Sequence, residues 1–443
     1  MPRFTVAIVG GGLCGLVLAL ALEKYAPDVD YQIYEAVAEL TTAGAGIGVP
    51  PRTLFVLREL GLESALLKIA GNGEKDRLNI LFRKSDQKEG YAFIDPTPDS
   101  TELQWTFHRG ELQKLFLDHI CYPERIHMGK RLASYTQSVG PNGRVELRFH
   151  DGSTAACDVM LGADGIKSQV RATMYTQLAN AAQNAGRAEE AVSLRSHINA
   201  VFSGSSVYRG LLEREAVVDD AKSSSNMLIN IAMYPISQGR ILNVAASITN
   251  PELEGTVYEG PWTTEVSREE VRREYVGWES EVEEVVQQIG SWNKWAINVV
   301  KDLPTFVDTR VALLGDAAHS MTPFQGAGAG QGFEDTLMLG ILFGQSVVTK
   351  DSIPAALRIY DQFRRFFAQK VAALSMQSGL MQSLIYPELD AAIAAGRASV
   401  TEEEYLARIA ENIERLKEWR RGTDVMEDCL SAVRLLRDTI SGE

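Results

Sequence analysis

A glycine-rich turn near the start of the chain constrains the fold more than any other feature of the sequence. Residues 10–15 have the sequence Gly-Gly-Gly-Leu-Cys-Gly and follow Phe4–Val9, an apolar, β-branched run that predicts a strand buried on both faces. The turn opens a predicted helix over Leu13–Lys24, and Asp30–Tyr34 predicts the next strand. This strand–turn–helix–strand order predicts an α/β fold that begins with a Rossmann-like domain.

The spacing Gly10-x-Gly12-x-x-Gly15 is typical of a turn that binds a dinucleotide. Gly10 permits the tight turn, Gly12 lets the backbone approach a pyrophosphate, and Gly15 lets helix and strand pack closely. The free N–H groups at the helix N-terminus are available to the phosphates. Glu35 follows Gly15 by 20 residues, where its carboxylate can bind the hydroxyl pair of a ribose. The motif predicts a dinucleotide but does not distinguish FAD from NAD.

Two later turns make that distinction. Asp164-Gly165 follows an apolar strand that starts near Cys157, and Gly315-Asp316 follows the predicted strand Arg310–Leu314. Asp316 is placed to accept hydrogen bonds from a polyol. The loop after it is rich in glycine, which lets backbone lie against a flat ring, and the next helix start can stabilise negative charge on that ring. Together with the N-terminal turn, these segments predict FAD.

The rest of the chain predicts a sheet-rich domain inserted into the FAD-binding domain, followed by a helical tail. Strand patterns occur at Val207–Leu212, Met227–Tyr234 and Arg240–Ile248, and Glu265–Ile289 is mostly helical in pattern. Residues 176–196 predict an exposed helix or a mobile insert. We expect a discontinuous FAD-binding domain over 1–75, 105–175 and 298–345, an antiparallel substrate sheet over 76–104 and 195–297, and a helical C-terminal region over 346–443.

Composition excludes several classes of partner. The net charge is −14 and the basic residues are spread along the chain, which argues against nucleic acid and against an anionic membrane as the main partner. The longest apolar runs, such as Leu16–Leu22, are too short to span a bilayer, and the N-terminus enters a strand directly. The four cysteines lack metal-ligand spacing, so no metal site is expected. We therefore expect a cytoplasmic protein that is a monomer or a homodimer.

These motifs resemble those of the single-component FAD-dependent aromatic hydroxylases of the para-hydroxybenzoate hydroxylase fold, most closely the salicylate hydroxylase-like subgroup. The most specific stretch is Gly315–Gly332, with the sequence Gly-Asp-Ala-Ala-His-Ser-Met-Thr-Pro-Phe-Gln-Gly-Ala-Gly-Ala-Gly-Gln-Gly. Further agreement is found at Gly44–Gly48, His108-Arg109 and Tyr208–Gly210. The resemblance extends from Val6 to about Phe343 and becomes less specific in the helical tail.

The resemblance implies tightly bound FAD in an extended pose, with NAD(P)H as a transient cosubstrate. Glu35 would contact the adenosine ribose, Arg109 the pyrophosphate and ribityl chain, and Asp316 the ribityl chain. Asp164-Gly165 would serve both nucleotides, so no second glycine motif is required. The cofactor-binding residues implied in this way are Gly10, Gly12, Gly15, Glu35, Ala36, Gly46, Gly48, Arg109, Arg131, Asp164, Gly165, Asp316, Pro323, Gly326, Gly328 and Ala329.

The implied reaction is hydroxylation of a small phenolic acid with NAD(P)H and O₂ through a flavin C4a-hydroperoxide. Arg209 would pair with a carboxylate or phenolate of the substrate and Tyr234 would donate to it. Pro323 and Phe324 would complete the substrate site, and His319 is either a catalytic base or a histidine that packs a helix. Decarboxylative hydroxylation of a salicylate-like acid is favoured. Two alternatives stay open: hydroxylation of a hydroxybenzoate without loss of CO₂, and dearomatising hydroxylation of a phenolic polyketide. The choice between NADH and NADPH as cosubstrate is also open.

The chain departs from the family pattern at two places. Ala36–Thr42 lacks the arginine often found beside the adenosine, and Phe324 replaces a histidine of several relatives. A flavin-dependent halogenase is disfavoured because Trp292-Asn-Lys-Trp295 has the wrong spacing for the halogenase motif. A non-catalytic flavoprotein that docks a partner through its helical tail is the alternative from another class.

Overall fold

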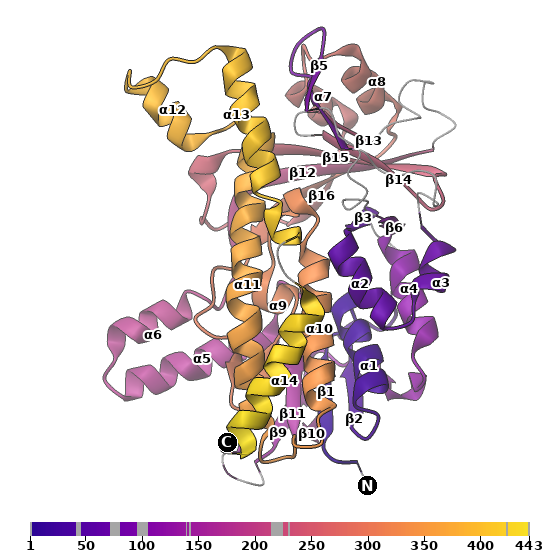
Figure 1. The fold of residues 1–443 in the computed structure, drawn as a ribbon, viewed down its shortest axis with the longest axis vertical. Helices are drawn as coiled ribbons and strands as arrows, with labels where there is room; N and C mark the ends of the chain where they lie inside the picture. Colours follow the sequence, from indigo (N-terminus) through magenta and orange to yellow (C-terminus); the bar gives the residue numbers. More distant parts are fainter. Residues whose placement is uncertain are drawn as a thin grey trace.

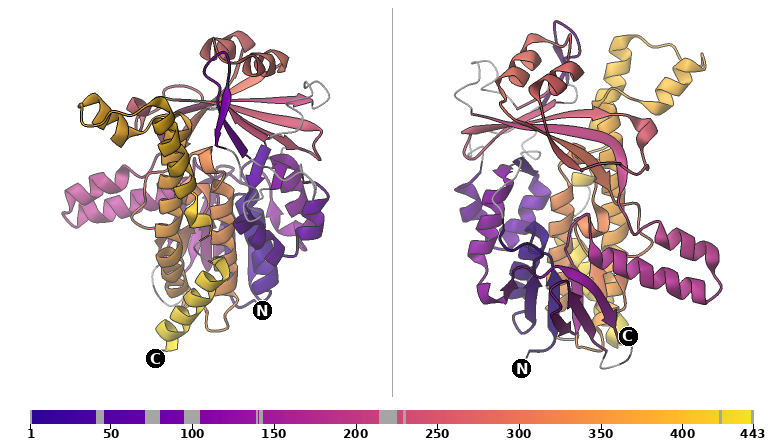
Figure 2. Two further views of the ribbon diagram at one scale, coloured as in Figure 1. Left: turned by 45° about the horizontal axis from the view of Figure 1, so that its top comes forward. Right: turned by 180° about the vertical axis from the view of Figure 1, so that it is seen from behind.

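The structure of this chain is a computed structural model that describes residues 2–40, 46–70, 80–94, 105–138, 140, 143–213, 225–228, 231–421 and 424–441. A parallel sheet with its helices lies in the lower half of Figure 1, and a second, mainly antiparallel sheet lies across the upper half. The long helix α11 (Ile353–Gln382) runs beside both, as the rotated views of Figure 2 also show. The α/β fold with an antiparallel sheet and a helical tail is therefore confirmed.

The parallel sheet has the strand order β18-β19-β11-β1-β2-β7. Its strands are β1 (Thr5–Val9), β2 (Asp30–Tyr34), β7 (Ile126–His127), β11 (Val159–Gly162), β18 (Val307–Asp308) and β19 (Val311–Leu313). All pairs are parallel except β18 with β19. The register aligns Val9 with Tyr34 and Gly162, and Gly162 with Leu313. The carboxyl ends of four strands therefore meet at one edge, although the residues are far apart in the sequence.

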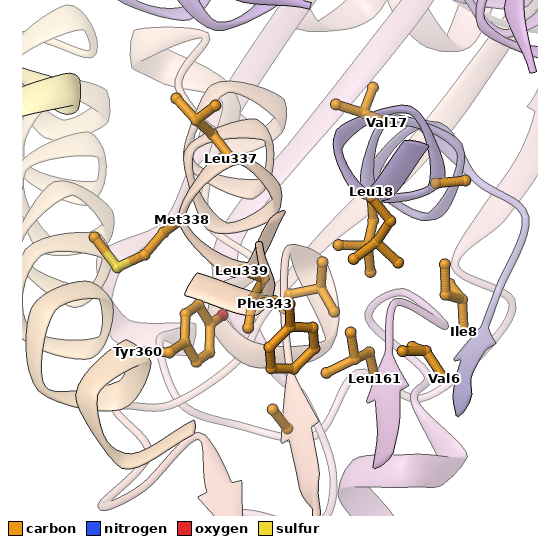
Figure 3. Packing of buried hydrophobic residues seen from close by; sticks show 14 of the residues in the cluster. Val6, Ile8, Val17, Leu18, Leu161, Leu337, Met338, Leu339, Phe343 and Tyr360 are labelled. Atoms are coloured by element: carbon orange, nitrogen blue, oxygen red, sulfur yellow. The ribbon is translucent and has the colours of Figure 1, made fainter. Parts of the chain in front are cut away.

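Helices cover this sheet and bury its apolar side chains. Helix α1 (Leu13–Tyr25) is apolar on all sides because it lies between the sheet and α10 (Gly328–Phe343), and Figure 3 shows this packing. Gly340 permits the approach, since a Cβ there would lie 2.9 Å from the Cβ of Ala21. The remaining helices of this part are α2 (Pro51–Glu59), α3 (Glu63–Leu67), α4 (Arg109–His119) and α9 (Asp316–His319).

The second sheet has the strand order β16-β17-β12-β15-β14-β13-β4-β5. Its pairs are antiparallel apart from β13 with β4. The strands are β4 (Ile80–Lys84), β5 (Tyr91–Ile94), β12 (Val201–Glu213), β13 (Ser225–Leu228), β14 (Ile231–Ile236), β15 (Ile241–Thr249), β16 (Thr263–Val266) and β17 (Trp292–Val299). The expectation of one strand over Met227–Tyr234 is wrong, because this segment belongs to the antiparallel pair β13–β14; residues 229–230 lie outside the described residues.

The alternation of side chains along these strands separates an outer from an inner face. Outward residues such as Tyr208, Met233 and Trp292 are buried against helices α7 (Arg268–Glu274) and α8 (Ser280–Gln288). The alternate positions, among them Arg209 and Tyr234, point to the opposite face, toward the parallel-sheet half of the molecule. The helical pattern expected over Glu265–Ile289 starts only at Arg268, since Glu265 belongs to strand β16.

Smaller elements complete the fold. An antiparallel sheet of order β10-β9-β8 comprises β8 (Leu132–Gln137), β9 (Val145–Phe149) and β10 (Thr154–Cys157), and β3 (Gly46–Val49) pairs with β6 (Trp105–His108). Helices α5 (Gln169–Asn184) and α6 (Ala188–Arg195) project from the side of the molecule in Figure 1, which confirms the helical alternative for residues 176–196. The C-terminal helices are α11, α12 (Pro387–Ala394), α13 (Glu402–Arg415) and α14 (Val425–Ser441). Among the described residues, no helix combines the length and apolar character needed to cross a membrane.

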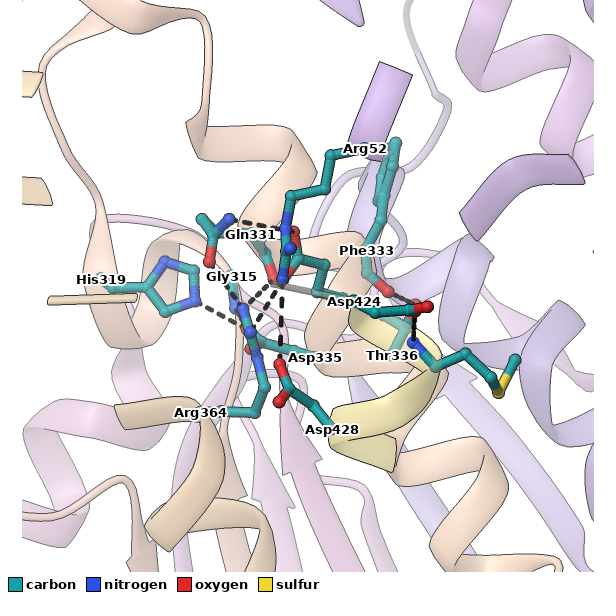
Figure 4. Close-up of polar contacts among 12 residues, drawn as sticks. Arg52, Gly315, His319, Gln331, Phe333, Asp335, Thr336, Arg364, Asp424 and Asp428 are labelled. Atoms are coloured by element: carbon teal, nitrogen blue, oxygen red, sulfur yellow. Dashed lines mark hydrogen bonds and ion pairs between the residues drawn. The ribbon is translucent and has the colours of Figure 1, made fainter. Parts of the chain in front are cut away.

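A buried network of ion pairs joins α10 to α2 and α11 (Figure 4). Arg364 contacts Asp335 (2.8 Å) and Glu334 (2.9 Å), and Arg52 contacts Glu334 (2.7 Å); each side chain is at most 4% exposed. Asp335 also accepts hydrogen bonds from the Gly315 N–H (2.9 Å) and from Nε2 of His319 (2.6 Å). Burial alone raises the pKa of the Asp335 carboxyl, but the charges of His319 and Arg364 hold it below its usual value. The network therefore fixes the turn that follows β19.

Arg364→Met is expected to destabilise the protein by about 3–5 kcal/mol, because it removes the arginine partner of buried Asp335 and one of the two arginine partners of buried Glu334. The matched control is Arg58→Met, which removes an exposed arginine that lies 2.7 Å from Glu63. That change should cost at most about 1 kcal/mol. Urea unfolding followed by fluorescence compares the two variants, and equal losses would contradict the structural role of the network.

Candidate active site

The loops that follow four strands of the parallel sheet converge on its carboxyl edge. They begin after Val9, Tyr34, Gly162 and Leu313, and they contain the candidate residues Gly10, Glu35, Asp164 and Asp316. A cavity of about 250 Å³ opens at this edge. It is lined by the candidate residues Gly10, Gly12, Glu35, Ala36, Arg131, Asp164 and Gly165. Parallel strands thus bring together side chains that the sequence separates, as expected for a nucleotide site.

The glycine turn has the geometry that its spacing predicts. Gly10 has φ of +107°, and a Cβ there would overlap the carbonyl oxygen of Ala163. A Cβ at Gly15 would overlap the carbonyl oxygen of Gly10. At Gly12, by contrast, no atom of the described residues lies within 4 Å of the Cβ position. Gly12 is also the N-cap of α1 and has no side chain to occupy the helix N–H groups, so the turn fits a pyrophosphate.

Glu35 closes the turn and lines the cavity. Its Oε2 accepts from the Gly11 N–H (2.6 Å) and its Oε1 from the Val37 N–H (2.9 Å). Each carboxylate oxygen has a second lone pair, so these bonds leave capacity for ribose hydroxyls. The same cavity is lined by Arg131 and by Lys130 and Lys167, two cations that no sequence motif predicted. The cations supply positive charge in a region where no arginine follows Glu35.

The Asp164-Gly165 loop is shaped by its own hydrogen bonds. The Asp164 carboxylate accepts from Ser168 Oγ (2.5 Å) and from the N–H groups of Gln169 (2.7 Å) and Val170 (3.1 Å). Burial raises the pKa of this carboxyl, and these bonds oppose the rise. The Asp164 carboxylate therefore fixes the start of α5, and Asp164 also lines the cavity.

Arg171 connects this loop to the other parts of the site. Its buried guanidinium donates to the carbonyl oxygens of Ile166 (2.6 Å), Ile198 (3.3 Å) and Ala317 (2.9 Å). These carbonyls belong to the Asp164 loop, to the segment that leads into β12, and to α9. No sequence pattern predicted these three partners of Arg171.

Asp316 lies at the start of α9, next to the Pro323–Gly330 loop. Its side chain is exposed, yet the surrounding protein raises the pKa of its carboxyl by desolvation, against the charges of His319, Arg109 and Arg171. The Cβ position of Gly328 is 4.0 Å from Oδ1 of Asp316, so the glycine-rich loop lies next to this carboxyl.

The loop presents backbone rather than bulky side chains. Gly326 has φ of +61°, Pro323 is exposed, and Gly328 and Ala329 are half-buried in the first turn of α10. The N-cap of α10 is Ala327, which has no group to occupy the helix N–H donors. A flat ring that gains negative charge fits this surface, because the helix N-terminus stabilises such charge.

Arg209 and Tyr234 lie on the inner face of the second sheet, beside β3. A Cβ at Gly46 would be 2.6 Å from Cε2 of Tyr234, so glycine is required there. Asn243 Oδ1 accepts from the Gly46 N–H (2.9 Å) and fixes β3 against the sheet. Gly48 continues β3 opposite Thr106. Sequence patterns gave no signal for Asn243.

The guanidinium of Arg209 lies over an aromatic ring. Its Cζ is 5.3 Å from the ring centroid of Trp295, and its Nε is buried with no hydrogen-bond partner among the described residues. Burial lowers the pKa of Arg209, and the positive charge of Arg109 lowers it further. Tyr234 has the opposite effect and raises it. Arg109, Arg209 and Tyr234 thus share one environment, although they come from α4, β12 and β14.

The side chains of His319 and Phe324 have different surroundings from those of Arg209 and Tyr234. The His319 side chain is fully buried in the ion-pair network, with Nε2 bonded to Asp335. The ring of Phe324 packs on Gly379 in α11, where a Cβ would overlap it. The structure thus groups His319 with the residues that support the turn after β19.

Comparison with known proteins gives a consistent result. Residues 3–375 match the family described as FAD binding domain. The chain is 32% identical over 425 residues to the FAD-dependent monooxygenase str9 of Strobilurus tenacellus, which covers 88% of this chain and 91% of that protein. It is 31% identical over 404 residues to a salicylate hydroxylase of Pseudomonas putida, with 87% of each chain covered.

A solved structure of a salicylate hydroxylase substrate complex superposes with a TM-score of 0.80 at 26% identity and covers 98% of both chains. The fold, the glycine turn and the acidic turns at the sheet edge agree with these similarities. The chain belongs to the FAD-binding monooxygenases and is an FAD-dependent aromatic monooxygenase.

Proposed function

We propose that this enzyme hydroxylates a phenolic carboxylic acid and that Arg209 binds the substrate carboxylate. The observation that carries this proposal is the buried Nε of Arg209, which has no hydrogen-bond partner among the described residues. A buried guanidinium N–H without a hydrogen-bond partner is unfavourable, and an anionic ligand removes that penalty. No carboxylate is among the groups that shift the pKa of Arg209.

The surroundings of Arg209 favour a flat, anionic ligand. Trp295 covers one side of the guanidinium, and Arg109 adds a second positive charge nearby. A carboxylate accepts two parallel hydrogen bonds from a guanidinium, which fixes its orientation as well as its position. A benzoate held in this way has its ring plane set by its carboxylate.

Tyr234 is proposed to donate a hydrogen bond to an oxygen of the substrate. Burial raises the pKa of its phenol, and the positive charge of Arg209 lowers it by a smaller amount. The net effect is a raised pKa. The phenol therefore keeps its proton at neutral pH and acts as a donor. With Arg209 it provides contacts for two adjacent oxygen functions, as a salicylate-like acid carries.

The cofactor contacts are proposed from the site geometry. Glu35 would hold the adenosine ribose, the turn at Gly12 the pyrophosphate, and Asp316 the ribityl chain. The Pro323–Gly330 loop would lie beside the flavin ring, opposite the sheet that carries Arg209. Bound FAD supplies the electron transfer and oxygen activation, with NAD(P)H as the electron donor. The protein orients the substrate and keeps water from the reacting atoms.

Among possible products, we favour decarboxylative hydroxylation of a salicylate-like acid. The similarity to salicylate hydroxylases and the pairing of Arg209 with Tyr234 support this choice. Hydroxylation of a hydroxybenzoate with retention of the carboxylate would use the same contacts.

Incubation of the FAD-loaded enzyme with ¹⁸O₂, NADH or NADPH, and a panel of phenolic acids separates these two reactions. Labelled catechol with released CO₂ supports decarboxylative hydroxylation, and labelled dihydroxybenzoate supports hydroxylation with the carboxylate retained. Failure of every phenolic acid to accelerate flavin reduction contradicts both reactions.

Arg209→Met is expected to weaken salicylate binding by roughly 10- to 150-fold, the size of one charge-assisted hydrogen bond or slightly more. Binding of the neutral analogue salicylamide should change less than threefold. Titration of the flavin absorbance measures both affinities. Arg83→Met is the matched control, because Arg83 belongs to the same sheet but pairs with Glu279. Equal losses for salicylate and salicylamide would show that Arg209 does not recognise the carboxylate.

Tyr234→Phe is expected to raise the fraction of NAD(P)H consumed as H₂O₂ by several-fold and to weaken substrate binding by roughly 3- to 10-fold, as for one neutral hydrogen bond. Tyr208→Phe is the matched control, since Tyr208 lies on the outer face and donates to Glu270. Peroxide and hydroxylated product are quantified in the same reactions. If both variants remain equally coupled, Tyr234 does not contact the substrate.

A further inference from the structure

We propose that the C-terminal segment Leu416–Arg420 holds the Pro323–Gly330 loop in the position that meets the flavin ring, with Gln325 and Trp419 as positioning residues. This segment includes the short 3₁₀ helix Glu418–Arg420 and lies beyond residue 375, where the match to the FAD-binding family ends. The inference rests on the proposed placement of the loop beside the flavin.

The side chain of Gln325 is the point of attachment. It is 4% exposed, and its Oε1 accepts from Nε1 of Trp419 (2.6 Å). Its Nε2 lies within hydrogen-bond distance of Leu416 O (2.9 Å) and Ser378 Oγ (2.8 Å). The indole N–H of Trp419 can only donate, so the amide oxygen of Gln325 must face it and the amide nitrogen must face Leu416.

The backbone of Gln325 is held by the same segment. Its carbonyl oxygen accepts from a guanidinium nitrogen of Arg420 (2.6 Å). Both the side chain and the main chain of one loop residue are therefore bound to Leu416–Arg420. If the segment moved away, the amide oxygen and the main-chain carbonyl of Gln325 would lose these donors, which is costly in a protein interior.

Helix α11 braces the loop from the same side. Ser375 Oγ donates to the Thr322 carbonyl (2.7 Å), and Gln382 Nε2 donates to the Phe324 carbonyl (3.0 Å). Pro323 on the loop remains exposed. The polar groups of Thr322, Phe324 and Gln325 are thus bound on the side of α11 and the C-terminal segment, which leaves the backbone around Gly328 available for the proposed contact with the flavin.

Apolar packing strengthens the attachment. Trp419 is 7% exposed and forms a cluster with Ala327 of the loop and Val371 of α11. Its ring meets Phe367 edge-on, with ring centroids 6.1 Å apart. Ala327 is the N-cap of α10, so this contact also determines where the N-terminus of α10 points.

The test is Trp419→Phe, which removes the N–H donor but keeps an aromatic ring. We expect faster hydrogen exchange in residues 323–330, a roughly tenfold weaker FAD affinity, as for one unsatisfied buried group, and a changed visible circular dichroism of the bound flavin. The matched control is Trp292→Phe, because Trp292 is fully buried behind the second sheet. If Trp419→Phe resembles the control in all three measurements, the inference is wrong.

A second variant guards against misfolding. Arg420→Met removes the donor to the Gln325 carbonyl at a half-buried position and should shift the same measurements in the same direction. Unchanged exchange, affinity and dichroism in this variant also overturn the inference. None of these measurements needs a substrate, so they stand whatever ring the enzyme hydroxylates.

Gly328→Leu separates this inference from the placement of the loop. The nearest atoms to the Cβ position of Gly328 belong to Met321 (3.7 Å) and Asp316 (4.0 Å), so the position is open enough to admit a larger side chain. If Gly328→Leu leaves FAD affinity and dichroism unchanged, the loop is not beside the flavin and the proposed placement fails. If it changes them while Trp419→Phe does not, the placement stands and the role of the C-terminal segment fails.

Discussion

The geometry at the carboxyl edge of the parallel sheet depends on one interaction, the pairing of Arg364 with Asp335 and Glu334. The carboxylate of Asp335 also binds the N–H of Gly315, so one buried contact sets both the position of α10 and the turn that presents Asp316. Buried ion pairs contribute little net stability compared with apolar packing, but loss of one partner is strongly destabilising because it leaves an uncompensated buried charge. Here the pairs join α11 to α10 and to the end of β19.

Sequence alone predicted the residues at the sheet edge because their positions follow from local rules. A glycine turn after a strand, an acid at the end of the next strand, and a second acidic turn each have a fixed place relative to a parallel strand. The register of β1, β2, β11 and β19 then brings Glu35, Asp164 and Asp316 to one edge. The resemblance to a family added Arg209 and Tyr234.

The rest depends on contacts between segments that no local pattern encodes. Lys130 reaches the cavity because its N–H bonds the carbonyl of Glu35, 95 residues earlier. Trp295 meets Arg209 because β17 pairs with β12 in a particular register. Amphipathic patterns predicted that the C-terminal helices bury one face, but not that Trp419 would bury its indole against Gln325. Periodicity identifies a buried face and leaves its partner undetermined.

The strand order of the parallel sheet has a consequence for synthesis of the protein. Strand β1 lies beside β11, and β19 completes the edge only after more than 300 residues have been made. During translation the glycine turn thus emerges long before Asp316 and before α10 and α11, which support the turn at Gly315. Such a sheet has high contact order, and its closing strand forms late. The residues at this edge of the sheet can therefore come together only in the nearly finished chain.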